Sequence, residues 1–226
     1  MIIVLLVVIT LITYFGGVYV RNRHTANWIR VIGDVLIVGV LALMVANDTY
    51  HFGMQPKTQT STMAMTSVNR SSKMPMLLYQ SLGTSGKNKV YLYKTSSTAK
   101  VQHTNPEQTS DQIIRTNAQA RLVSQKKVWS YKNGFYRTLF GISGNEGEHI
   151  QTTNKFFVPQ NWAILSTKQA KKLARNLRNP QMQKQLTQQV QHKLLVTLQK
   201  QPTMTKAQQR VLAAKYQRQA VEKLAQ

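Results

Sequence analysis

The sequence contains no cysteine among its 226 residues. A disulfide framework, a thiolate metal site and a cysteine nucleophile are therefore excluded. Acidic residues are also scarce, because seven Asp and Glu stand against thirty Lys and Arg, which leaves a formal net charge of +23 at pH 7. This excess of positive charge attracts polyanions and leaves few carboxylates for acid–base chemistry.

Charge is absent from the first twenty residues, which open with an unbroken apolar run over residues 2–9. At about 1.5 Å per residue, a helix over residues 2–20 reaches roughly 28 Å, close to the ~30 Å hydrocarbon thickness of a bilayer. The alternative interpretation is a cleaved signal peptide, but the segment has no basic n-region and its apolar core is longer than that class requires. It therefore predicts a transmembrane helix.

A second apolar run covers residues 31–46 and is interrupted by Asp34. The link before it, residues 21–30, is too short to form a domain, so the two runs predict a helical hairpin. Trp28 and Tyr50 flank the second run, as aromatic residues do at membrane–water interfaces. Small residues are expected where the helices touch. These are Gly39, Ala42 and Ala46.

The arginines of the link determine the expected orientation. Arg21, Arg23 and Arg30 are expected in the cytoplasm by the positive-inside rule, which places the N-terminus and the long C-terminal part outside it. Asp34 follows Arg30 by four residues, the spacing at which opposite charges pair on a helix. We expect an interfacial ion pair of Arg30 and Asp34. The alternative is an intramembrane acid that handles protons or ions.

Composition divides the chain into four parts. Residues 1–50 form the two-helix transmembrane anchor, and residues 51–75, rich in Thr, Ser and Met, form either a linker or the first strand of the next domain. In residues 76–165, short apolar and aromatic runs separated by Gly, Asn and Ser predict a small antiparallel β-rich domain. Residues 166–226 form a basic tail rich in Gln and Lys. The predicted fold class is a membrane-anchored α+β protein with C-terminal amphipathic helices.

Two hairpins are expected in the β-rich domain. The dipeptide Asn133-Gly134 suits a two-residue type I′ turn, so residues 127–132 should pair antiparallel with residues 135–140. A second hairpin is expected over residues 77–95. Its loop, residues 83–88, holds two glycines and a lysine, but their spacing does not match a phosphate-binding P-loop.

Few residues are candidates for catalysis. Outside the anchor there are five carboxylates and four histidines, and only Glu146, Glu148 and His149 cluster in the sequence. On a strand the two glutamates would share one face while His149 points to the other, so a three-ligand metal site is not favoured. We therefore predict no catalytic, cofactor-binding or metal-binding residues, and we interpret the cluster as a solvated loop.

Three helices are predicted in the basic tail. Residues 166–169 and 205–208 match the capping-box pattern, and Asn179-Pro180 is a third start signal. The helices are expected over residues 167–178, 181–200 and 206–225, each with an apolar stripe. These stripes either dock on the β domain, pair with another copy, or lie on an anionic surface. The residues expected to contact polyanions are Lys168, Lys171, Lys172, Arg175 and Arg178.

Several strings of residues carry a resemblance to a known family. They are Tyr50-His51-Phe52-Gly53-Met54, Leu77-Leu78-Tyr79, Val90-Tyr91-Leu92-Tyr93 and Phe140-Gly141-Ile142-Ser143-Gly144. With the double anchor, they resemble an uncharacterised membrane-protein family of lactic-acid bacteria, domain-of-unknown-function family 4811. The resemblance covers most of the chain. It implies a bacterial cell-membrane protein whose relatives are often encoded beside drug-efflux transporters of the major facilitator type, and it implies no functional residues.

The sequence predicts a non-enzymatic, membrane-anchored accessory or binding protein with a strongly basic extracytoplasmic module and no cofactor. Expected partners are the lipid bilayer, an anionic cell-wall polymer or anionic lipid, a membrane transporter by resemblance only, and a second copy through the C-terminal helices. Nucleic acid is not expected. One alternative is a cytoplasm-facing binder of anionic lipid or nucleic acid. Another is a cell-wall hydrolase that uses Glu146 and Glu148.

Overall fold

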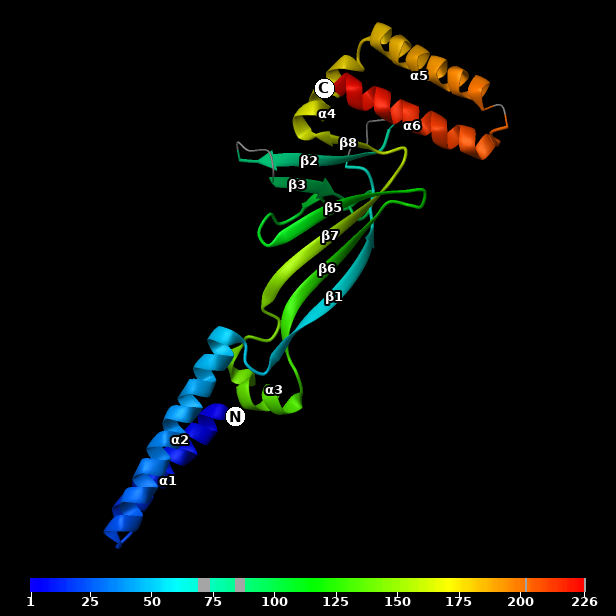
Figure 1. Ribbon diagram of the computed structural model, residues 1–226. Helices are drawn as coiled ribbons and strands as arrows, with labels where there is room; N and C mark the ends of the chain where they lie inside the picture. The colour runs from blue at the N-terminus through cyan, green and yellow to red at the C-terminus, as the bar shows by residue number, and fades with distance from the viewer. Residues whose placement is uncertain (69–73, 84–87, 202, 226) are drawn as a thin grey trace. The chain divides into compact units, whose positions relative to one another are not determined.

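The computed structural model describes residues 1–226 except 69–73, 84–87, 202 and 226 (Figure 1). The chain forms two compact units, each built from two separate segments. The N-terminal unit comprises Met1–Gln59 and Lys126–Gln151, and the C-terminal unit comprises Thr60–Gln125 and Thr152–Gln226.

Two long apolar helices open the N-terminal unit. Helix α1 covers Ile2–Tyr19 and α2 covers Arg23–Tyr50, with mean hydropathies of 2.5 and 2.4 over their most apolar stretches. Both are long and apolar enough to cross a membrane. The link between them is shorter than predicted, because Asn22 caps α2 by accepting a hydrogen bond from His24 N at 3.0 Å.

Glycines bring α1 and α2 into close contact. A Cβ atom added to Gly33 would overlap Thr13 Oγ1, and one added to Gly17 would lie 2.6 Å from Nε of Arg30. Gly39 has nothing within 4 Å of its Cβ position, so the prediction that it lies at the contact is wrong. The buried residues of α2 recur every seven positions, and Gly39 falls beside this face rather than on it. They are Ala26, Gly33, Val40 and Asn47.

The described residues contain two four-stranded sheets. The first has the order β1-β6-β7-β5, with β1 at Met54–Ala64, β6 at Arg121–Tyr131, β7 at His149–Pro159 and β5 at Thr109–Thr116. The second has the order β4-β3-β2-β8, with β4 at Gln102–His103, β3 at Asn88–Tyr93, β2 at Met76–Leu82 and β8 at Ala163–Ser166. Of the two interpretations of residues 51–75, a linker or a first strand, β1 confirms the strand for part of the segment.

Both sheets are mixed rather than antiparallel. The second hairpin is confirmed, because β2 pairs antiparallel with β3, with Leu78 opposite Leu92. Residues 84–87 of its loop lie outside the described residues. However, β2 also pairs in parallel with β8, and β5 in parallel with β7. The predicted α+β class is confirmed, but the sheets are mixed where an antiparallel β-rich domain was expected, because the chain returns to each sheet through long connections that allow parallel pairing.

The first predicted hairpin is wrong. Asn133 does not occupy a turn but caps helix α3, Gly134–Phe140, by accepting a hydrogen bond from Tyr136 N at 3.1 Å. A short 3-10 helix, η1 at Gly141–Ser143, follows. Asn is favoured both in type I′ turns and at helix N-caps, so the dipeptide alone does not decide between a hairpin and a helix start.

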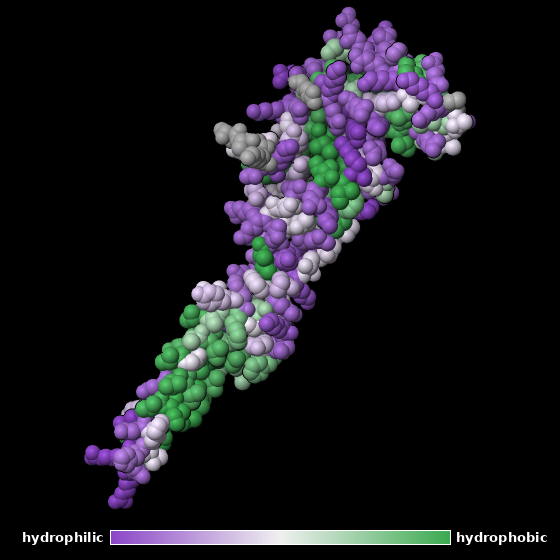
Figure 2. Space-filling view, viewed as in Figure 1, coloured by the Kyte–Doolittle hydropathy of each residue, from purple (hydrophilic) through white to green (hydrophobic). Residues whose placement is uncertain are grey.

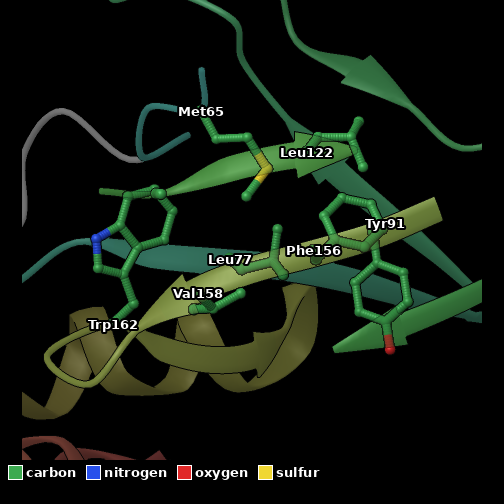
Figure 3. Packing of buried hydrophobic residues seen from close by; sticks show 8 residues of the cluster. Met65, Leu77, Tyr91, Leu122, Phe156, Val158 and Trp162 are labelled. Carbon is green, nitrogen blue, oxygen red and sulfur yellow. The ribbon is translucent and has the colours of Figure 1, made fainter. Parts of the chain in front are cut away.

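A hydrophobic core joins the two sheets within the C-terminal unit. Phe156 and Val158 of β7 are fully buried and pack with Leu77 of β2 and Leu122 of β6 (Figure 3). The ring of Tyr91 on β3 lies 5.1 Å from that of Phe156. Strands from both sheets therefore contribute to one interior.

The three predicted tail helices are present. They are α4 at Thr167–Asn176, α5 at Pro180–Lys200 and α6 at Lys206–Ala225. A second core contains Leu173 of α4 and Val221 of α6 together with Met76 of β2 and Leu165 of β8. The apolar stripe of α4 docks on the β domain, which is one of the three arrangements considered, and α6 docks there through Val221 and Ala225. Helix α5 packs along α6 (Figure 1).

Candidate functional site

Helix α4 presents two chemically different faces. It begins at a complete capping box, in which Gln169 N donates to Ser166 Oγ at 3.1 Å and Ser166 N donates to Gln169 Oε1 at 2.9 Å. Leu173 is buried, and Ala170 and Leu177 pack beside it in the core shared with β2 and β8. The apolar face of α4 is therefore used in docking.

The opposite face of α4 is basic. Residues three, four and seven positions apart share a helix face, and four cations have this spacing on the side away from Leu173. A fifth lies two residues after the end of the helix, and all five side chains are exposed. We call this surface the basic face of α4. It consists of the predicted residues Lys168, Lys171, Lys172, Arg175 and Arg178.

The neighbouring helices extend the same charge. Residues 166–226 contain thirteen basic residues and one acid, Glu222. Seven further cations are exposed along α5 and α6 and extend the positive charge over the tail. They are Lys184, Lys193, Lys200, Lys206, Arg210, Lys215 and Lys223.

The carboxylate of Glu222 forms contacts with other residues of the C-terminal unit. Its Oε1 accepts a hydrogen bond from Ile164 N at 3.3 Å and lies 3.6 Å from Nη2 of Arg115. Its Oε2 lies 3.9 Å from Nε of Arg218. This network links α6 to β8 and β5, and it removes the one acid of the tail from the basic surface.

Arg115 and Arg218 are held by more than Glu222. Arg115 Nη1 donates to the carbonyl oxygens of Trp162 at 2.8 Å and Pro159 at 3.2 Å. Desolvation by burial, followed by the charge of Arg218, lowers the pKa of Arg115, and Glu222 opposes that shift. Arg218 is buried and donates from Nη1 to Gln160 Oε1 at 3.3 Å. The network is therefore structural.

A polar pocket of about 160 Å³ lies near Asp111 of β5, between the ends of β3 and β5. Asp111 is half-buried and accepts hydrogen bonds from Thr104 Oγ1 at 3.0 Å and Asn154 Nδ2 at 2.9 Å. Burial raises the pKa of Asp111, while these two hydrogen bonds act in the opposite direction. Sequence reasoning did not single out this residue. Its only signal is that it is the one carboxylate in strand β5, which also carries Gln112 and Arg115.

Desolvation also raises the pKa of Tyr91, with a further contribution from Asp111. Lys89 at the same pocket stacks its ammonium 4.8 Å from the centre of the Tyr79 ring. The pocket therefore combines an acid, a phenol and a cation, but its carboxylate oxygens are already occupied by protein donors. Within the described part of the chain, no group of three or more His, Asp or Glu residues lies close enough to hold a metal ion.

The acid cluster predicted at Glu146, Glu148 and His149 is divided between different partners. Glu146 forms an ion pair with Arg137 of α3 and accepts a hydrogen bond from Ser130 Oγ at 3.4 Å. Glu148 Oε2 lies 2.8 Å from Nε2 of His51, whose ring stacks on Trp129 with centroids 4.3 Å apart. The structure therefore engages both glutamates in joining α2, α3 and β6.

The arginines predicted to determine topology lie at one end of the α1–α2 pair. Arg21 and Arg23 are exposed. Arg30 Nη2 donates to the carbonyl of Gly17 at 2.6 Å, and no ion pair joins it to Asp34 among the described residues. Arg30 thus contacts α1 at Gly17, and the predicted pairing of Arg30 with Asp34 stays a prediction.

The fold and site describe an α+β protein with two long apolar helices and a strongly basic helical surface. Residues 22–173 match the family model described as Domain of unknown function (DUF4811). Because this match covers more than half of the chain, the protein belongs to the DUF4811 family, as its resemblance predicted. No curated protein and no solved structure matches the chain.

Proposed function

We propose that this protein is a non-enzymatic, two-span membrane protein whose basic helical surface binds an anionic polymer outside the cytoplasm. The anchor is supported by the exposed apolar side chains of α1 and α2, among them Ile12, Val35 and Val38, which are 62%, 67% and 64% exposed. Figure 2 shows hydrophobic residues over the length of this pair and hydrophilic residues at its link. Apolar side chains at this density need lipid around them.

The orientation rests on the link. Arg21 and Arg23 are exposed between two apolar helices, and positive charge at such a link favours the cytoplasmic side. Residues 51–226 then lie outside the cytoplasm. Long domains are translocated largely regardless of their charge, so the basic character of this part does not oppose the orientation.

The observation that carries the binding function is the two-faced character of α4. Its apolar face is buried against β2 and β8, so its cations are held on a docked helix rather than on a free tail. The single acid of the tail is turned inward to Arg115. A surface of one sign raises the local concentration of polyanions and steers them to it. Phosphate-bearing polymers match this chemistry.

Single-cysteine labelling tests the orientation, because the native chain has no cysteine. Gln199→Cys places a thiol on an exposed position of α5, and His24→Cys places one at the link. A membrane-impermeant maleimide is expected to label the Gln199→Cys variant on intact cells and the His24→Cys variant only after permeabilisation. The reverse pattern would favour the cytoplasm-facing alternative.

Binding is tested with the full chain in phosphatidylcholine nanodiscs and fluorescently labelled long-chain polyphosphate. Affinity should fall steeply with salt, because the Debye length shrinks from about 8 Å at 0.15 M to about 3 Å at 1 M. A variant with Lys168→Gln, Lys171→Gln and Arg175→Gln should bind about tenfold more weakly, since three exposed contacts contribute about 0.5 kcal/mol each.

The matched control removes the same charge from the N-terminal unit through Lys126→Gln, Lys127→Gln and Lys132→Gln, all at exposed positions. Its affinity should change much less. Binding that is absent or insensitive to salt would contradict the proposal. Displacement of polyphosphate by phosphatidylglycerol vesicles at lower phosphate concentration would identify anionic lipid as the preferred ligand.

A further inference from the structure

Besides Met1, three large apolar side chains lie exposed on the N-terminal unit outside the two long helices. Phe135 of α3 is 68% exposed, Ile142 of η1 is 66% exposed, and Phe52 just after α2 is 45% exposed. Tyr50 at the end of α2 is 79% exposed. Exposed apolar residues that gather in one region of a small unit mark an interaction surface. We call these four residues the interfacial patch.

The patch belongs to a well-packed element. Phe140, on the inner side of α3, is fully buried, and its carbonyl accepts a hydrogen bond from the buried hydroxyl of Tyr131 at 2.9 Å. The ring of Tyr136 stacks on Phe140 and meets Phe52 edge-on at 5.9 Å. Helix α3 is therefore held in one orientation by its aromatic inner side, and the exposure of Phe135 follows from that orientation.

The same contacts place α3 at one end of the apolar pair. Ile2, the first residue of α1, is 1% exposed and packs in the cluster that contains Phe140 and Tyr131. The nitrogen of Met1 donates to the carbonyl of Thr138 at 3.0 Å, and the nitrogen of Phe52 donates to the carbonyl of Ala46 at 3.1 Å. In Figure 1, α3 lies beside the N-terminus, at the end of α1 and α2 away from their link.

We propose that the interfacial patch is a third membrane contact, seated in the boundary between lipid headgroups and acyl chains. This inference rests on the proposed function, because it requires α1 and α2 to span the bilayer. The patch continues the lipid-facing surface of the two helices at their outer end, where aromatic residues are favoured. Lys132, which is exposed two residues before α3, and the Arg137–Glu146 ion pair supply polar groups that fit the headgroup region.

The contact gives α3 a function that its packing does not explain. The start of β1 and the end of β6 are joined to α3 through Met54 and Tyr131, both buried in its cluster. With the patch in the interface, these strand ends are held at the membrane surface. The occupant of the patch is lipid, rather than another protein, because the patch lies at the depth at which the spans enter the headgroup layer.

The test uses an environment-sensitive nitrobenzoxadiazole label on single cysteines in the full chain, reconstituted in phosphatidylcholine nanodiscs. Ile142→Cys and Phe135→Cys report the patch, and both replace exposed side chains, so the packing of α3 is preserved. Val38→Cys on α2 reports the span, and Lys127→Cys, exposed on β6, is the aqueous control.

Labels at 135 and 142 are expected to emit at shorter wavelength than the label at 127. They should be about twofold better quenched by lipids brominated near the headgroup than by lipids brominated deep in the chain, which corresponds to a depth of about 5–10 Å. The label at 38 should be quenched by the deep bromines. If the label at 38 is quenched but the labels at 135 and 142 match the label at 127 in emission and quenching, the patch does not contact lipid. The inference then fails, while the proposed membrane anchor is retained.

Two further outcomes also decide the question. If the label at 38 is not quenched, both the anchor and the patch are overturned. If the labels at 135 and 142 emit at short wavelength but brominated lipids do not quench them, protein covers the patch and lipid does not, which overturns the inference alone.

Discussion

Glu222 of α6 accepts a hydrogen bond from the backbone nitrogen of Ile164 in β8 at 3.3 Å. Through this contact the one acidic side chain of the tail secures α6 to the edge strand of the second sheet. The same carboxylate faces Arg115 and Arg218, so a single negative charge compensates two guanidinium groups. Docking of α6 therefore depends on an electrostatic contact as well as on apolar packing.

Glu222→Gln should destabilise the C-terminal unit by about 2 kcal/mol, because it leaves two partly or fully buried arginines without their counter-charge. The measurement is urea-induced unfolding of the full chain in detergent, followed by circular dichroism. Glu107→Gln is the matched control, since Glu107 is exposed. Equal effects of the two substitutions would show that the Glu222 network contributes no stability of its own.

Gly33→Ala should weaken the packing of α1 against α2 by about 1–3 kcal/mol, as expected for an overpacked contact. The added methyl would overlap Thr13 Oγ1, which already donates to the carbonyl of Ile9 at 2.8 Å. Gly39→Ala, on the same helix, has open space and gains helix propensity. Unfolding of the full chain by sodium dodecyl sulfate should distinguish the two variants, and a shared effect would exclude the close contact at Gly33.

Asp111 should make stability depend on pH. Its pKa in the folded state is raised above the ordinary value of 3.8, so the folded protein holds this proton more tightly than the unfolded chain does. The favourable contribution is therefore complete below pH 3.8 and is lost as pH rises through the folded pKa. Stability relative to an Asp111→Asn variant should fall across this window.

The measurement is the free energy of unfolding of wild type and Asp111→Asn between about pH 3.5 and pH 6.5. This range begins near the pKa of an ordinary aspartate and extends above it. The difference between the two proteins should change within this range and be constant above it. A difference that rises with pH would mean that the hydrogen bonds from Thr104 and Asn154 outweigh desolvation.

Local signals predicted the helices well. The capping boxes at Ser166 and Thr205 and the start signal at Asn179 each form their expected hydrogen bonds, and the three tail helices follow them. The two long apolar helices were also predicted correctly, because a long uncharged apolar run indicates a helix of membrane-crossing length. The hairpin of β2 and β3 was identified from two short runs of apolar and aromatic residues that flank a loop with two glycines.

Prediction from local sequence was wrong where one short motif is compatible with two kinds of secondary structure. Asn133-Gly134 satisfies a hairpin turn and a helix start, and only the packing of Phe140 against Tyr131 and Ile2 selects the helix. The parallel pairings of β5 with β7 and of β2 with β8 join segments far apart in the chain. No local pattern specifies such pairs. The interfacial patch was missed for the same reason, since Phe135 was assigned to a strand.

The sequence by itself determined the two long apolar helices, the cationic excess and the beginnings of the tail helices, because each depends on composition or on contacts within a few residues. Tertiary structure alone decided what the apolar faces of those helices pack against. It seated Leu173 of α4 in a core with β2 and β8, and it gave Glu222 and Asp111 their partners. Burial and long-range pairing involve residues distant in the chain, so their energies exist only once the chain has folded.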